Sequence, residues 1–256
     1  MNSRMAIGKK ALMLKADHGF ALGVREMQLF RLNPLDYMNL RHEACLKLTR
    51  DVVLGQAFHK LLLQGRWGVQ VDSAADGVWG HKPLAAFRPD ETNRVTPADM
   101  WRLEHMLERF SQNREIQKLF LNTRVYRNCG GLFIENYTGC ECFFNADFIL
   151  PDKGYVVDVK TCPDTSYTGI ALEIERLHYH WQAWWAATGA SLSFEKPLNN
   201  FIFIFVGQNA PFEIRICRAS ADMFELAREE LLPFIGLYEN FFEAGQFKTR
   251  RPECVM

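Results

Sequence analysis

Hydrophobic and polar residues alternate most clearly between residues 139 and 161, and this stretch predicts two neighbouring strands. The first expected strand covers residues 140–150, and residues 151–154 supply Pro, Asp and Gly, which are typical of a turn. The second expected strand, residues 155–161, is rich in β-branched and aromatic side chains. Because successive side chains on a strand point to opposite faces, Asp158 and Lys160 lie on the same face of a strand that is otherwise apolar.

This pair of strands carries candidate chemistry. Asp147 precedes Asp158 by eleven residues and lies beside it if the strands pair as a hairpin. Two carboxylates a few ångströms apart repel each other unless a cation lies between them, and carboxylate oxygens suit Mg²⁺ or Mn²⁺. A neighbouring lysine, here Lys160, can orient a water molecule or neutralise charge on a phosphoryl group. The pattern indicates metal-assisted phosphodiester hydrolysis, and a surface hairpin with solvated charges is the alternative.

The rest of the chain predicts helices and strands in alternation. The expected helices cover residues 35–65 (as one helix or two), 96–110, 114–121, 167–188 and 220–244. The expected strands cover residues 125–127, 132–137, 140–150, 155–161, 200–207 and 212–218. Gly130 and Gly131 are expected to link the first two strands, and Gly189 is expected to close the helix that begins near residue 167. That helix joins two strands as a crossover, which requires them to be parallel.

Two of the expected helices carry polar residues that could reach a site. Gly55 and His59 are four residues apart, and Tyr179 and Gln182 are three apart, so each pair shares one helix face. A histidine among apolar positions is more often a satisfied core residue than a ligand. The polar positions of the second helix could likewise be incidental to a core helix.

Four pieces of sequence, taken together, resemble the PD-(D/E)XK nuclease superfamily. They are Gly55-Gln-Ala-Phe-His59, Asp147, Asp158-Val-Lys160-Thr161 and Tyr179-His-Trp-Gln182. Residues from about 50 to 245 are most similar to the nuclease domain of exodeoxyribonuclease VIII (RecE) and its phage-borne relatives. The resemblance implies one α/β domain over residues 1–256, with an N-terminal arm at 1–34. It implies a central mixed sheet flanked by helices, in a restriction-endonuclease-like core with a helical N-terminal part.

The resemblance also implies an activity and a metal site. The expected activity is a metal-dependent 5′→3′ exonuclease that degrades one strand of linear double-stranded DNA and leaves 3′ overhangs for recombination. Asp147 and Asp158 would hold one or two Mg²⁺ ions, for which Mn²⁺ can substitute. The backbone carbonyl of Val159 would supply a further oxygen, and His59 would help at the metal or at the scissile phosphate.

The remaining implied roles fall on Lys160 and the helix after it. Lys160 would position the attacking water and support its deprotonation, while Tyr179 and Gln182 would orient Lys160 or the DNA backbone. Relatives often carry a further glutamate before the first aspartate. The residue nearest that position is Asn128, and the nearest acid is Glu135, which is expected to be a solvated strand residue.

Composition limits these readings without excluding them. The chain of 256 residues holds 30 basic and 30 acidic residues, so its net charge is zero and its basic residues must cluster if it grips DNA. Seven cysteines without paired spacing favour the cytoplasm, and no apolar run reaches the length of a membrane span. The resemblance implies a homo-oligomeric ring around DNA and a single-strand annealing protein as partner. A structure-specific endonuclease and a catalytically inactive DNA-binding or assembly protein remain alternatives.

Overall fold

The computed structural model describes residues 22–34, 37, 45–47, 50–65, 70–71, 81–83 and 94–244. The helices in these ranges are α2 (Val24–Leu32), α4 (Arg50–Gln64), α5 (Pro97–Gln112), α6 (Arg114–Phe120), α7 (Tyr167–Arg176), α8 (Tyr179–Phe194) and α9 (Ala221–Glu243). The long strands are β5 (Tyr126–Ile134), β6 (Glu141–Leu150), β7 (Tyr155–Cys162), β8 (Asn200–Gly207) and β9 (Ile214–Arg218). Four short strands precede them: β1 (Cys45–Lys47), β2 (Gln70–Val71), β3 (His81–Pro83) and β4 (Arg94–Val95).

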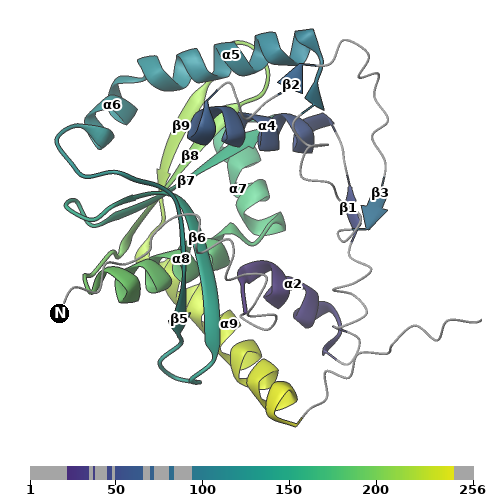
Figure 1. Cartoon of the computed structure of the whole chain (residues 1–256), viewed down its shortest axis with the longest axis vertical. Helices are drawn as coiled ribbons and strands as arrows, with labels where there is room; N and C mark the ends of the chain where they lie inside the picture. The colour runs from purple at the N-terminus through teal and green to yellow at the C-terminus, as the bar shows by residue number, and fades with distance from the viewer. Residues whose placement is uncertain are drawn as a thin grey trace, which may run out of the picture.

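The five long strands form one sheet in the order β5-β6-β7-β8-β9. Within this sheet only the β7–β8 pair is parallel, and the two strands are joined through α7 and α8 as a crossover connection requires. The other pairs are antiparallel, so the sheet is mixed. Helices α4 and α5 lie on one side of the sheet, and α8 and α9 lie on the other (Figure 1). The predicted α/β class, with a mixed sheet flanked by helices, is confirmed.

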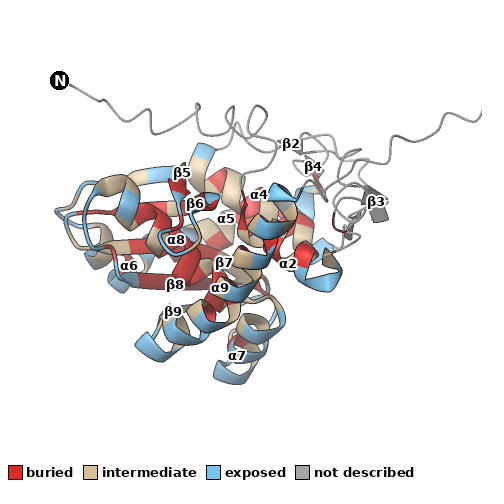
Figure 2. Cartoon of the chain, turned by 90° about the horizontal axis from the view of Figure 1, so that it is seen from below, coloured by how far each residue is buried: buried red, intermediate tan, exposed pale blue. Residues whose placement is uncertain are grey.

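Strand β8 shows how the sequence builds this three-layer core. Its alternate side chains Phe201, Phe203 and Phe205 pack in the cluster that contains α8, and Ile202 and Ile204 pack in the cluster that contains α4. A strand covered on both faces reads as a continuous apolar run, as residues 201–206 do. Figure 2 shows buried positions concentrated in β8 and its neighbours, with exposed positions on the outer sides of α7 and α9.

Strands β6 and β7 pair only near the turn that joins them. The paired positions run from Leu150↔Tyr155 to Phe148↔Val157, and beyond them the two strands separate. The free edge of β6 is then taken by Leu22, whose amide donates to the carbonyl of Glu141 at 3.0 Å and whose carbonyl accepts from Phe143 at 2.8 Å. The N-terminal segment therefore occupies the space beside β6 that β7 leaves, and α2 begins immediately after it.

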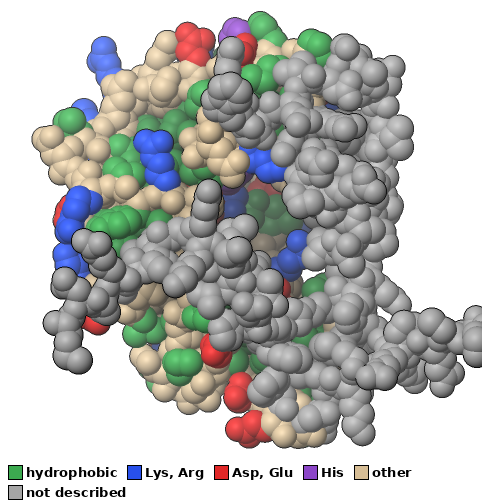
Figure 3. All heavy atoms as spheres, viewed as in Figure 1, with side chains coloured by type: hydrophobic (Ala, Val, Ile, Leu, Met, Phe, Trp, Pro, Cys, Tyr) green, Lys and Arg blue, Asp and Glu red, His purple; other side chains and the backbone are tan. Residues whose placement is uncertain are grey.

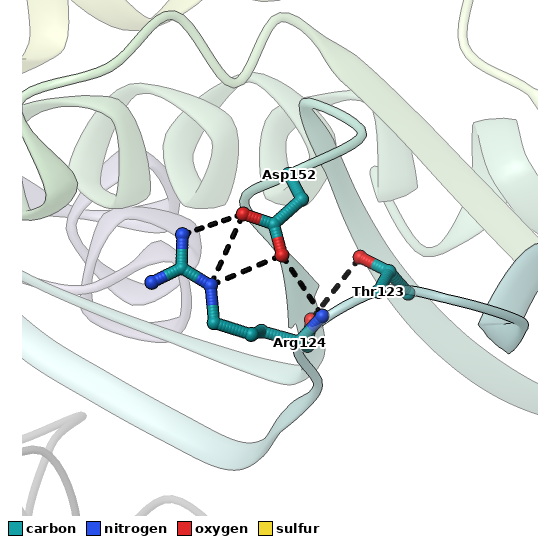
Figure 4. A network of polar contacts seen from close by, with 3 residues as sticks. All are labelled: Thr123, Arg124 and Asp152. Carbon is teal, nitrogen blue, oxygen red and sulfur yellow. Dashed lines mark hydrogen bonds and ion pairs between the residues drawn. The ribbon is translucent and has the colours of Figure 1, made fainter.

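The turn between β6 and β7 is fixed from outside the sheet. The guanidinium of Arg124 donates to both carboxylate oxygens of Asp152, and the Arg124 amide donates to Oδ2 at 3.0 Å (Figure 4). Lys153 donates to the carbonyls of Lys118 and Leu119 at the end of α6. These contacts tie the start of β5 and the end of α6 to the turn that sets the register of β6 and β7.

Three expectations about glycine and helix boundaries were wrong. Gly130 and Gly131 lie inside the single strand β5. Position 130 is glycine because a Cβ there would meet the carbonyl oxygen of Phe144 at 2.8 Å. Gly189 lies inside α8, where a Cβ would meet ring atoms of Phe144 at 2.4 and 2.6 Å. The helix expected over 167–188 is two helices, which meet at Leu177 and the left-handed residue His178.

The N-terminal part also differs from expectation in one place. Residues 45–47, within the stretch expected to be helical, form strand β1, which pairs with β3. The helix expected there is α4, and α2 ends at Leu32, just before Asn33 and Pro34. None of the helices in the described ranges combines the length and apolarity needed to cross a membrane.

Alanine at Gly189 should destabilise the fold although alanine favours helices. The new methyl group would press on the ring of Phe144, and overpacking of this kind costs about 1–3 kcal/mol of the free energy of unfolding. The matched control is Gly236→Ala in α9, where a Cβ has only Thr138 Cγ2 nearby, at 3.9 Å. That variant should gain about 0.5–1 kcal/mol from helix propensity. Urea unfolding measures both, and equal effects at the two positions would contradict the packing described.

Candidate active site

The separation of β6 and β7 brings two carboxylates together. Continuing the register from Phe148↔Val157 puts Asp147 across from Asp158. In place of a ladder hydrogen bond, the amide of Val159 donates to Asp147 Oδ2 at 2.7 Å. The two side chains are only 13% and 6% exposed. The predicted neighbouring carboxylates are therefore present, at the point where the strands part.

Lys160 and the start of α8 surround Asp158. The Lys160 ammonium is 2.5 Å from Asp158 Oδ2 and 4.7 Å from the centre of the Tyr179 ring. Gln182 Nε2 donates to Asp158 Oδ1 at 2.9 Å. Asp158 and Lys160 share a face of β7, and Tyr179 and Gln182 share a face of α8 directed at them, as the spacing of each pair predicted.

His59 reaches the site from the other side of the sheet. Its Nδ1 lies 3.3 Å from Asp147 Oδ1. Helix α4 can approach β7 closely because residue 55 is glycine: a Cβ there would meet Thr161 Oγ1 at 2.7 Å. The Gly55-to-His59 spacing thus has a physical reason, since the glycine brings the helix in and the histidine one turn later contacts the carboxylate.

Gln208, which the sequence did not single out, joins these elements at the end of β8. Its Nε2 donates to Thr161 Oγ1 and to the carbonyl of Asp51, each at 3.0 Å. Gln208 is 3% exposed. The buried amide thus ties the end of β7 to the first turn of α4. A glutamine directly after an apolar strand is too common a pattern to have been recognised in the sequence.

The pKa values of the two carboxyl groups shift in opposite directions, because their charged neighbours differ. Burial raises the pKa of Asp147, but the charges of His59 and Lys160 and the Val159 amide outweigh burial, so its pKa lies below the ordinary value. Burial lowers the pKa of His59, but attraction to Asp147 outweighs it, and the pKa is raised. Asp147 and His59 therefore form a charge-assisted pair when the imidazole is protonated.

Asp158 shows the opposite direction. Burial raises its pKa, the Lys160 charge opposes this and the Asp147 charge adds to it, and the net pKa lies above the ordinary value. Burial lowers the pKa of Lys160, but the Asp158 carboxylate outweighs it, so the pKa is raised and the ammonium stays charged. The cationic Lys160 is therefore what stabilises a carboxylate at Asp158 in so buried a place.

The donor atoms fit a Mg²⁺ or Mn²⁺ ion. In the described part of the chain, no three His, Cys, Asp or Glu side chains are arranged to hold a metal by themselves. Mg²⁺ commonly needs only one or two carboxylates, because water and substrate phosphate complete its octahedron. Asp158 Oδ2 is buried, and its partner among the described residues is the Lys160 ammonium, 2.5 Å away. Asp147 and Asp158 meet this requirement, while Val159 and His59 stay predicted ligands.

Glu135 has a structural role that the sequence reading did not predict. It is 2% exposed rather than solvated, which corrects the expectation. Its Oε2 accepts from the Thr138 amide and hydroxyl, each at 2.8 Å, and both of its oxygens accept from the Tyr137 amide. It fixes the turn between β5 and β6. The register of these strands places Asn128, not Glu135, across from Asp147.

A cleft of about 330 Å³ lies on the α8 side of the site, next to the two residues that contact Asp158 and Lys160. Tyr179 and Gln182 line it together with Asn145 of β6 and the start of α2, including Arg25 and Gln28. The sequence offered no functional signal in residues 1–34. The cleft depends on Leu22 pairing with β6, a long-range contact that no local pattern indicates.

A mixed sheet with two aspartates and a lysine where its central strands part defines a PD-(D/E)XK-type core. A family model described as a PDDEXK-like domain of unknown function (DUF3799) matches residues 45–253, and the chain belongs to this family. The predicted superfamily is thereby confirmed, and the closer likeness to exodeoxyribonuclease VIII stays a prediction.

Solved structures agree at the level of fold. A proposed exonuclease from Eubacterium rectale is similar in structure, with a TM-score of 0.61 and 12% sequence identity, over 95% of this chain and 89% of that one. A protein called SSO0001 matches over 54% of this chain and 61% of its own, with a TM-score of 0.29 and 15% identity, too low to support any conclusion. No curated protein sequence matches the chain.

Added metal should stabilise the protein through the carboxylate pair. A divalent ion that binds only the folded state raises Tm, and at saturating Mn²⁺ we expect a rise of about 5 °C in differential scanning fluorimetry. Asp158→Asn should abolish most of this rise, because the amide keeps the shape of the side chain but not its charge. Asp152→Asn, in the turn fixed by Arg124, is the control and should respond like the wild type. An unchanged rise in Asp158→Asn would place the metal elsewhere.

Proposed function

We propose that the protein is a metal-dependent nuclease that degrades one strand of linear double-stranded DNA from its 5′ end. The observation that carries the proposal is the arrangement at the β6–β7 fork, the place after Phe148 and Val157 where the two strands separate. Asp147 and Asp158 lie together there, and Lys160 lies against Asp158. Membership of the PDDEXK-like family and the fold shared with a proposed exonuclease support hydrolysis of nucleic acid. The direction of digestion and the 3′ overhang rest on the resemblance to the exodeoxyribonuclease VIII family.

The residues divide the work of phosphodiester hydrolysis. A divalent ion, when bound, supplies Lewis-acid polarisation of the scissile phosphate and makes a coordinated water more acidic. Asp147 and Asp158 would hold that ion, and His59 keeps Asp147 oriented through its Nδ1 contact. Lys160 donates to the attacking water and to the phosphoryl oxygens. The water's hydroxyl joins phosphorus, the bond from phosphorus to the 3′ oxygen breaks, and the leaving oxygen takes the proton.

Helix α8 prepares Lys160 for this role. Gln182 donates to Asp158 Oδ1, while the Lys160 ammonium pairs with Oδ2. The Tyr179 ring lies beneath the ammonium, and a cation over an aromatic face is stabilised even when water is removed. Preorganised charges of this kind act most strongly in a water-poor site. The lysine thus has a fixed place before substrate arrives.

The cleft beside Gln182 suits part of a DNA strand. Its volume of about 330 Å³ is within the range of small-molecule sites, and Arg25 and Asn145 offer donors to phosphate or base. On the face shown in Figure 3, Lys and Arg side chains of the described residues are scattered among acidic and apolar ones. A homo-oligomeric ring would gather such dispersed charges around the duplex. A single-strand annealing protein is the partner that the resemblance implies for the 3′ overhang.

End-labelled linear duplex DNA tests the function. With Mg²⁺ or Mn²⁺ the wild type should release a 5′ label before a 3′ label, and EDTA should stop the release. Lys160→Ala should lower the rate at least about a hundredfold, the usual loss when a group that stabilises the transition state is removed. Lys153→Ala is the matched control, because Lys153 contacts only carbonyls of α6 in its described hydrogen bonds.

Closed circular duplex separates the rival functions in the same assay. An exonuclease leaves it intact, whereas a structure-specific endonuclease of the same core would nick a circle that carries a flap or junction. If the wild type cleaves neither linear nor circular DNA with either metal, the exonuclease proposal fails and a DNA-binding or assembly role is preferred.

A further inference from the structure

The junction between α7 and α8 lies immediately before the residues that contact Asp158 and Lys160. His178 precedes α8 with φ 51° and ψ 44°, a left-handed conformation that is uncommon for residues other than glycine. Tyr179 is the first residue of α8, and Gln182 follows three residues later. A small rotation at His178 would therefore move both of these side chains away from the catalytic pair. Left-handed residues of this kind persist only where their surroundings hold them.

Helix α2 holds this junction by two polar contacts. Gln28 Nε2 donates to the carbonyl of Leu177 at 3.2 Å, and Arg31 lies 3.3 Å from His178 Nε2 through one guanidinium nitrogen. The His178 ring stacks on Trp181, with centroids 4.5 Å apart and an interplanar angle of 16°. The Arg31 guanidinium lies 5.3 Å from the centre of the same indole. Arginine, histidine and tryptophan thus form one assembly across α2 and α8.

The far side of this assembly is anchored to α9. Trp181 Nε1 donates to Glu230 Oε2 at 2.6 Å, and His180 Nε2 lies 2.9 Å from the same oxygen. Helix α2 is itself fixed to α9, because Phe30 makes edge contacts with Tyr238 and Phe241. Two neighbouring elements therefore hold the first turn of α8, one at His178 and one at Trp181.

We propose that Arg31 and His178 are positioning residues, through which α2 fixes the first turn of α8 so that Gln182 and Tyr179 keep their contacts with Asp158 and Lys160. The catalytic consequence of this positioning rests on the proposed nuclease function, whereas the mechanical coupling of α2 to α8 does not. It gives the N-terminal helix a role at a site to which it contributes no catalytic residue.

The contact between Arg31 and His178 requires a neutral imidazole. A guanidinium only donates, so His178 Nε2 must accept with its lone pair. The charged and titratable groups that face His178 are Arg31 from α2, His180 from α8 and Glu230 from α9. Burial lowers the pKa of His178, Arg31 and His180 lower it further, and Glu230 opposes them, with a net lowering. The contact is therefore present near neutral pH and is lost as acidification protonates His178 beside a second cation.

Hydrogen exchange tests the coupling without reference to activity. Arg31→Met keeps most of the side chain's length and removes its donors. At pH 8 we expect the amides of residues 177–183 to lose about fivefold or more of their protection factor. The control is Arg176→Met on α7, whose ion pair with Glu173 is exposed and within one helix. Unchanged protection in Arg31→Met overturns the proposal.

His178→Asn supplies the pH-dependent readout. Asparagine tolerates the left-handed conformation and does not titrate. In the wild type, protection of residues 177–183 should fall between pH 8 and pH 5.5 after correction for intrinsic exchange rates, and in His178→Asn it should change much less. Equal pH dependence in the two proteins overturns the proposal.

Kinetics then connect the coupling to cleavage. Arg31→Met should lower kcat about tenfold or more at pH 8 with little change in KM, because it misplaces groups that act on the reacting phosphate. Loss of protection with no wild-type cleavage would sustain the positioning and refute the nuclease. Wild-type cleavage with kcat unaltered in Arg31→Met would refute the positioning and sustain the nuclease.

Discussion

The buried ion pair of Asp158 and Lys160 is the interaction on which the rest of the site depends. Removing two charges from water costs several kcal/mol of folding free energy for each ion. The attraction between the ions offsets this cost only when their remaining hydrogen-bond donors and acceptors also have partners. Gln182 and Tyr179 meet this requirement from α8, so the position of that helix is dictated by the charges on β7. Two apolar side chains of similar size at positions 158 and 160 would need no such polar partners and would often be as stable. The expense of burying the charges is therefore best explained by chemistry rather than stability.

The position of Asp147 beside this ion pair depends on the opening of the sheet. If β6 and β7 paired along their whole length, the amide of Val159 would donate to the β6 backbone. It would then not be available to the Asp147 carboxylate. The strands instead part after Phe148, and the Asp147 carboxylate takes the free amide. His59 enters the opening from one face and α8 closes it from the other. The site is thus a place where the hydrogen-bond pattern between two strands is interrupted. The Val159 amide that is left without a backbone partner donates to the side chain of Asp147.

The sequence predicted the parts of this arrangement that local spacing controls. Alternation on β7 put Asp158 and Lys160 on one face, and helical spacing put Tyr179 and Gln182 on another. It failed where tertiary packing overrides local preference. Gly189 stands inside a helix because an aromatic ring occupies the space of its Cβ, and no pattern along the chain reports that ring.

Two further failures have the same origin. Glu135 was expected to be solvated because a single acid on an expected strand usually is, but the tight turn after it supplies three donors that a buried carboxylate can accept. Helix α2 carries no recognisable motif, and its place next to the cleft follows from the backbone pairing at Leu22 and from its packing on α9. Contacts between residues more than a hundred positions apart, such as that of Gln28 with Leu177, lie beyond any pattern read along the chain.

The zero net charge of the chain is a weaker argument against DNA than it first seems. Several of its charges are committed to partners within the molecule: Arg50 pairs with Asp99, Arg124 with Asp152 and Arg228 with Glu225. Such pairs cancel both in the total and in the field that a ligand meets, so the net charge does not say how the remaining charges are distributed over the surface. Near the site, the Lys160 ammonium lies against Asp158, and Arg25 lines the cleft that Tyr179 and Gln182 also line. For the proposed nuclease, Asp147 and Asp158 would repel a phosphate chain until a divalent ion neutralised them, so metal would be a condition for substrate binding as well as for hydrolysis.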